Sequence, residues 1–287
     1  MKKQMVIDQK QPQSVKKKVQ KSVEKFKWGD VTVLDIVPED IQESEKIPVF
    51  FAPGWSITIA CTQEVLLSLA DYNNRVITLN HKRIGGIRNT SEEMRKAHTI
   101  LSVLHRKNID KADGVGYSEG CTNLLLAACL NPNKFRNIVL VNPPGLSKKW
   151  AKLKIVKGFL MDAWGIKKCK NGYKKRKEIF KELLKYIFLN PIRSYREVDE
   201  ITHSNLVELL KNANNVGIKV SIVHNINDHT FDFTQANYTL LNAKNIHIEE
   251  FYAIEGGHFG LIKFPRRYMS IIAHALKMFK KSTKPKT

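Results

Sequence analysis

The chain has 287 residues, and its 43% apolar content is enough to fill the core of one large domain that carries an insertion. Lysine and arginine (48) outnumber aspartate and glutamate (27), which gives a formal charge of +21. Because a composition rich in lysine, isoleucine and asparagine can also reflect the base composition of a genome, we discount this charge as evidence for a nucleic-acid partner.

The expected elements of the first half alternate between strand and helix. Residues 1–18 are polar and lysine-rich, a composition that favours a poorly ordered tail. Two short strands around a turn at Gly29–Asp30 predict a hairpin, and the apolar run 47–52 predicts a strand buried on both faces. The spacing then predicts, in turn, a helix at 61–69, a strand at 75–79, a helix at 91–104, a strand ending at Val115, a helix at 122–130 and a strand at 137–141.

The alternation stops between residues 147 and 203, where apolar residues at helical spacing among many lysines predict a helical insertion. It resumes with a helix at 206–212, a strand at 220–224, a helix at 235–243, a strand at 247–252 and a helix at 265–280. Alternation of this kind predicts an α/β fold with a mostly parallel sheet and helices on both faces. The expected core comprises residues 19–146 and 204–281, followed by a basic tail at 282–287.

One pentapeptide matches the GxSxG nucleophile elbow, in which a serine sits on a strained turn between a strand and a helix. It contains Gly116, Ser118, Glu119 and Gly120. An expected strand precedes it and an apolar helix follows it, as the motif requires. We therefore take Ser118 as a candidate nucleophile.

A serine hydroxyl needs a base to remove its proton. His258 lies in a glycine-rich loop between the last expected strand and the last expected helix. Other histidines fall on expected helices, at a strand start or in the insertion: His98, His105, His274, His247 and His203. His258 is therefore the candidate base.

The base needs a carboxylate that orients its ring and stabilises the imidazolium. Asp228 follows the expected strand 220–224 and precedes His258. Asp232 is its nearest competitor, but Asp228 stands closer to the strand end. Asn142 occupies another strand end, and its amide cannot serve as the acid.

Together these motifs resemble the α/β-hydrolase superfamily from about residue 25 to residue 280. The segments that carry the resemblance are IPVFFAPGW, GVGYSEGCTNLLLAACLNP, FRNIVLVNPPG, SIVHNINDHTF and GGHFG. The resemblance implies a serine hydrolase with the chain order Ser118, Asp228, His258. It also implies an oxyanion hole formed by the backbone amides of Trp55 and Glu119.

The resemblance further implies that the insertion at 147–203 is a cap that shapes the acyl pocket. Several of its large apolar residues could line a cleft for a medium to long acyl ester, although packing between cap and core is their more common role. They are Trp150, Phe159, Leu160, Met161, Trp164 and Phe180.

Three alternatives stay open. The same triad serves acyltransferases and carbon–carbon bond hydrolases, and a hydrolase scaffold can also be a non-catalytic binding protein. In addition, Val15, Val19, Val23 and Phe26 recur at near-helical spacing among lysines, as in a helix lying on an anionic membrane. A solvated tail that runs into the first strand is the favoured interpretation of that segment.

The triad and oxyanion hole suffice for acyl transfer, so we expect no cofactor and no metal. Four cysteines form no CxxC pair and lack histidine partners at metal-ligand spacing: Cys61, Cys121, Cys129 and Cys169. The expected partner is a small acyl substrate. Without a secretory signal or an apolar run of membrane-spanning length, cytoplasmic residence is the default expectation.

Overall fold

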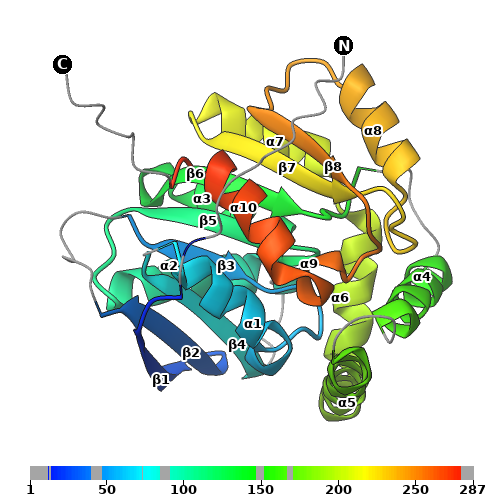
Figure 1. Cartoon of the computed structure of the whole chain (residues 1–287). Coiled ribbons are helices and arrows are strands. Elements are labelled where there is room, and N and C mark those ends of the chain that lie inside the picture. The colour runs from blue at the N-terminus through cyan, green and yellow to red at the C-terminus, as the bar shows by residue number, and fades with distance from the viewer. Residues whose placement is uncertain are drawn as a thin grey trace.

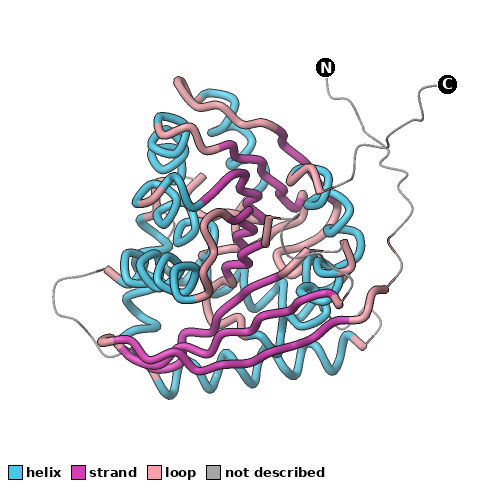
Figure 2. The backbone as a smooth tube through the Cα atoms, turned by 90° about the vertical axis from the view of Figure 1, so that its left-hand side faces the viewer, coloured by secondary structure: helices cyan, strands magenta, loops and turns pink. Residues whose placement is uncertain are grey.

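A computed structural model describes residues 12, 14–39, 47–72, 74–84, 91–146, 152–166 and 171–278. Within these residues the chain forms one sheet in the order β1-β2-β4-β3-β5-β6-β7-β8. Its strands are β1 (Lys17–Phe26), β2 (Gly29–Pro38), β3 (Val49–Ala52), β4 (Val76–Ile84), β5 (Ala112–Tyr117), β6 (Phe135–Val141), β7 (Lys219–Asn225) and β8 (Glu250–Ile254). The pairs β1–β2 and β2–β4 are antiparallel, and every pair from β4 to β8 is parallel. Figure 2 shows the twist that accumulates across these strands.

Helices cover both faces of the sheet (Figure 1). They are α1 (Ile59–Ala70), α2 (Glu92–Arg106), α3 (Gly120–Leu130), α4 (Lys152–Gly165), α5 (Gly172–Leu189), α6 (Pro191–His203), α7 (Leu206–Asn215), α8 (Phe233–Asn242), α9 (Gly260–Lys263) and α10 (Pro265–Ala275). Neighbouring strand residues alternate between two cores. Phe51 packs with α1 and α10, whereas Phe50 packs with α2, α3 and α7. This arrangement confirms the expected mostly parallel α/β sheet.

The N-terminal hairpin is confirmed, but its first strand begins earlier than expected. Residues 17–26 pair with β2 along their whole length, so the alternative of a membrane-surface helix is wrong for this segment. Only β2 neighbours β1 among the described strands, which makes β1 an edge of the sheet.

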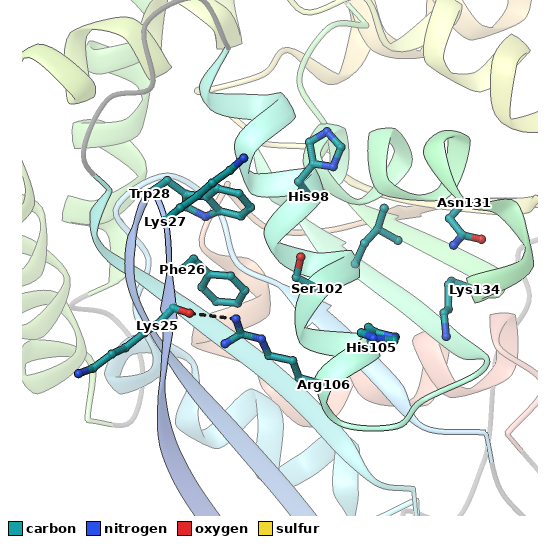
Figure 3. Close-up of a pocket in the computed structure, with 11 residues that line it drawn as sticks. Lys25, Phe26, Lys27, Trp28, His98, Ser102, His105, Arg106, Asn131 and Lys134 are labelled. Atoms are coloured by element: carbon teal, nitrogen blue, oxygen red, sulfur yellow. Dashed lines mark hydrogen bonds between the residues drawn. The ribbon is translucent and has the colours of Figure 1, made fainter.

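The hairpin turn is held against α2 by aromatic and basic side chains that line a surface groove of about 610 Å³ (Figure 3). Phe26 and Trp28 stack with their ring centroids 5.5 Å apart. The Trp28 indole donates a hydrogen bond to Thr99 Oγ1 at 3.0 Å. The Arg106 guanidinium covers Phe26 and donates to the Lys25 carbonyl. These groups satisfy one another and fasten the hairpin.

The expected break in the alternation is also present. The chain between β6 and β7 contains α4, α5 and α6 before α7, and Figure 1 shows α4 and α5 at the periphery of the molecule. His247 precedes β8 rather than opening it, because that strand begins at Glu250. None of the described helices combines the length and apolar character needed to cross a bilayer.

Candidate active site

Ser118 occupies a strained turn between β5 and α3. Its φ of 53° lies in the left-handed region that is uncommon for residues other than glycine. A Cβ atom on Gly116 would lie 2.7 Å from Cys121 Cα, and one on Gly120 would lie 2.1 Å from the Ala52 carbonyl oxygen. Both flanking positions therefore require glycine for the chain to make this turn.

The turn brings Ser118 to His258 and Asp228, as the sequence predicted. Ser118 Oγ lies 2.9 Å from His258 Nε2, and His258 Nδ1 lies 2.8 Å from Asp228 Oδ2. All three residues are at least nine-tenths buried. A chain of two hydrogen bonds thus joins the hydroxyl to the carboxylate through the imidazole.

The Asp228 carboxylate is oriented by its own loop. Its Oδ1 atom accepts hydrogen bonds from the backbone amides of Thr230 and Phe231, both at 2.8 Å. Oδ2 is therefore left for the imidazole. Asp232, the competing candidate, instead accepts from the Gln235 amide as the N-cap of α8.

The pKa of His258 reflects two opposing effects. Burial alone would lower it, because a cation is costly away from water. The charge and hydrogen bond of Asp228, with a further contribution from the charge of Asp162, outweigh burial and raise the pKa above its ordinary value. The Asp228 carboxylate thus favours the protonated imidazole.

Two further side chains hold the histidine loop, a role that no short motif of the sequence indicates. The Tyr117 hydroxyl and the Asn142 amide donate hydrogen bonds to the His258 carbonyl oxygen at 3.0 and 2.9 Å. Asn142 also accepts from the Asn225 backbone amide at 2.9 Å. The available signal was the presence of polar residues at the ends of apolar strands. Asn142 cannot serve as the acid, but its amide holds the loop that carries the base.

The loop that follows β3 passes directly against the serine. A Cβ atom on Gly54 would lie 2.8 Å from Ser118 Cβ. Within the described part of the chain, the backbone amides of Trp55 and Glu119 donate to no protein acceptor. Both amides are therefore free for a substrate oxygen, as the oxyanion hypothesis requires.

A network of buried charges adjoins the elbow. Lys96 Nζ lies 2.5 Å from Glu119 Oε1 and 2.7 Å from Glu197 Oε1. Arg193 Nε donates to Glu197 at 2.9 Å, and the Tyr186 hydroxyl donates to the same carboxylate. The network connects the residue after Ser118 to helix α6.

Burial and neighbouring charges shift the pKa values of Glu119 and Lys96 in this network. Burial raises the pKa of Glu119 to about 7, although Lys96 opposes the shift. Burial would lower the pKa of Lys96, but the charges of Glu119 and Glu197 outweigh it and raise that pKa. The ammonium therefore stays charged at neutral pH.

The residues expected to line an apolar cleft are dispersed. Phe159 is buried edge-on against Trp55 and Phe259, and Phe180 packs against the core. Leu160, Met161 and Trp164 are exposed. Trp150 lies outside the described residues. A cavity of about 40 Å³ beside the oxyanion loop has a mixed lining, in which the charged residues Lys96, Glu119 and Arg193 stand among neutral and apolar ones.

The described residues contain no group of three or more histidine, cysteine or acidic side chains placed to hold a metal. Cys61, Cys121 and Cys129 are free thiols, and Cys169 lies outside the described residues. Burial raises the pKa of the Cys121 thiol well above its ordinary value, so it is poorly suited to act as a nucleophile.

No protein-family model matches the chain, and no curated protein matches its sequence at a significant level. Solved structures do match. A serine hydrolase from the hydrocarbon-degrading bacterium Cycloclasticus zankles is 14% identical, with a TM-score of 0.64 over 92% of this chain and 100% of that one. A structure reported with the carboxylesterases of the thaumarchaeon Nitrososphaera gargenis is 16% identical, with a TM-score of 0.63 over 90% and 98%.

A meta-cleavage product hydrolase from Pseudomonas fluorescens is 13% identical, with a TM-score of 0.64 over 86% of this chain and 94% of that one. The likeness extends over 86% or more of this chain in each of the three. At such low identity it bears on architecture alone. The chain has the α/β-hydrolase fold.

Proposed function

We propose that this protein is a serine hydrolase that cleaves a carboxylic ester or a related acyl substrate through an acyl-enzyme on Ser118. The observation that carries the proposal is the buried relay from Ser118 Oγ through His258 to Asp228, with distances of 2.9 and 2.8 Å. The free amides beside the serine support it, and so do structural neighbours described as a serine hydrolase and as carboxylesterases.

The first half of the reaction forms the acyl-enzyme. His258 Nε2 takes the proton from Ser118 Oγ as the oxygen attacks the substrate carbonyl, and the carbonyl oxygen becomes an anion. The amides of Trp55 and Glu119 stabilise that anion. When the tetrahedral intermediate collapses, His258 returns the proton to the departing alcohol or amine.

The second half releases the acid. Water replaces the leaving group, and His258 removes its proton as it attacks the acyl carbon. Collapse of the second tetrahedral intermediate restores Ser118 Oγ and its proton. Throughout, Asp228 keeps Nδ1 protonated and stabilises the transient imidazolium. In this scheme α4–α6 form the cap over the acyl site. No cofactor takes part.

A carbon–carbon bond hydrolase is the second candidate. One structural neighbour is described as a meta-cleavage product hydrolase, and the same triad serves that chemistry. An acyltransferase would use the same groups with an alcohol or amine in place of water. Cytoplasmic residence stays a prediction.

The test is hydrolysis of p-nitrophenyl esters from acetyl to palmitoyl by the wild type and by Ser118→Ala. We expect the wild type to hydrolyse these esters and Ser118→Ala to be inactive. The acyl chain length that gives the highest activity measures the size of the acyl site. A fluorophosphonate probe should label the wild type and not the variant. Labelling without ester turnover would indicate a different acyl acceptor or a carbon–carbon substrate. Absence of both would contradict the proposal and indicate a non-catalytic protein.

A further inference from the structure

The corner where α5 meets α6 exposes an unusual amount of apolar surface. Each of its five large apolar side chains is more than half exposed: Leu184 (53%), Phe188 (80%), Leu189 (51%), Ile192 (71%) and Tyr195 (63%). Residues three or four apart share one side of a helix, so Leu184 lies beside Phe188, and Ile192 beside Tyr195. We call these five residues the α5–α6 corner.

The corner is not required for packing of the two helices. Helix α5 already buries Ile179 and Leu183 on its inner side, and α6 buries Val198 and Ile201. Large apolar side chains that stay exposed after the core is complete, and that gather in one region, mark a contact surface in soluble proteins. Figure 1 places α5 at the outer edge of the molecule, where a large partner can reach it.

Positive charges border the corner on both helices. Lys185 lies one turn before Leu189, and Arg196 lies one turn after Ile192. Both are exposed, and neither has a carboxylate partner among the described residues. Lys181 also borders the corner and has only a loose contact with Glu178, at 3.8 Å. The surface is therefore an apolar centre with a basic rim.

We propose that the α5–α6 corner docks on an anionic lipid surface. Phe188 and Ile192 enter the boundary between headgroups and acyl chains, and the basic rim contacts the lipid phosphates. A second copy of this chain is a poorer partner, because a twofold contact places like surfaces together and brings each lysine against another basic rim. The proposal does not depend on catalysis.

The test is flotation of the full chain with phosphatidylcholine vesicles that contain or lack phosphatidylglycerol, at low and high salt. We expect binding to the anionic vesicles that high salt weakens. The double variant Phe188→Ser/Ile192→Ser should lose at least about tenfold in vesicle binding, since two large apolar groups no longer enter the lipid. The charge-reversed variant Lys185→Glu/Arg196→Glu should also bind vesicles about tenfold or more weakly.

The matched control is Tyr238→Ser/Leu241→Ser on α8, whose side chains are exposed to a similar degree. It should bind as the wild type does, and thermal melting should show all variants folded. Binding that survives both corner variants would overturn the proposal, since the basic termini would then explain it. Failure of the wild type to bind would also overturn it. So would a dimer, measured by light scattering, that the apolar corner variant dissociates.

Discussion

The ammonium of Lys96 lies 2.5 Å from a carboxylate oxygen of Glu119, the residue that follows Ser118. The same ammonium lies 2.7 Å from Glu197 on α6. One buried cation therefore links the residue after Ser118 to α6. We expect the position of the Glu119 amide, and with it the proposed oxyanion hole, to depend on this contact.

Lys96→Met should lower both stability and turnover. The change leaves the buried Glu119 carboxylate without its cation, while Glu197 keeps Arg193. Loss of one partner from a buried ion pair typically costs about 3–5 kcal/mol. Chemical denaturation measures the stability, and p-nitrophenyl ester kinetics measure kcat and KM. In the folded fraction we expect kcat to fall by a larger factor than KM changes, because the Glu119 amide stabilises the transition state. Lys96→Arg keeps the charge and should recover part of both; equal loss in the two variants would contradict this account.

Activity should rise with pH through a midpoint above the ordinary pKa of histidine, about 6.5. Only neutral His258 accepts the serine proton, and Asp228 together with Asp162 holds its pKa up. The contribution of His258 to folding stability should change with pH in the opposite direction. A raised pKa means that the protonated form stabilises the fold at low pH, and that contribution is lost as pH rises through the folded-state pKa. The pH profile of kcat/KM measures the midpoint.

Asp228→Asn should lower kcat by about ten-thousandfold, the loss typical when the histidine tautomer is no longer fixed. The midpoint of the residual activity should move to lower pH, because the charge that raised the pKa of His258 is gone. Asp232→Asn is the control. Its side chain caps α8, so activity should stay near the wild-type value. A large loss of activity in Asp232→Asn would indicate that Asp232, and not Asp228, orients the histidine.

Gly54→Ala should impair catalysis through a direct clash. The added methyl would lie 2.8 Å from Ser118 Cβ, and overpacking of this kind costs about 1–3 kcal/mol. We expect a reduced kcat and a lower melting temperature. Gly165→Ala is the matched control, since its added methyl would have no atom within 4 Å. Unchanged kinetics in Gly54→Ala would show that the loop does not press on the serine.

Asn142→Ala should loosen the histidine loop. The change removes a donor to the His258 carbonyl and an acceptor from the Asn225 amide, each worth about 1–3 kcal/mol when left unpaired. Turnover should fall while substrate binding changes little. Tyr117→Phe removes only the other donor to the same carbonyl and should have a milder effect. Hydrogen exchange at residues 255–260 should rise in both variants.

The sequence predicted the parts of the site that local motifs encode. The elbow glycines, the loop of His258 and the strand end before Asp228 each leave a recognisable short pattern. The charge network has no such short pattern, because Lys96, Glu119 and Glu197 stand far apart in a chain where most lysines and glutamates face water. The role of Asn142 was hidden for the same reason, since its partner lies 116 residues away.

The segment from Lys17 to Phe26 shows why local spacing alone misleads. Its valines recur every four residues, which fits a helix, but four is also an even number and places them on one side of a strand. Pairing with β2 along ten residues decides the outcome. On that side Val19 and Val23 remain about half exposed, so the apolar pattern carried little information about burial.

The position of β1 at the sheet edge gives the lysines of this segment a role in keeping molecules apart. An open edge of ten residues is a template on which a strand from another molecule could add. Lys17 pairs with Asp71, but Lys18, Lys21 and Lys25 lie exposed along it, and a like-charged neighbour would have to align against all three. The basic N-terminal segment thus protects the chain from aggregation through its own sheet.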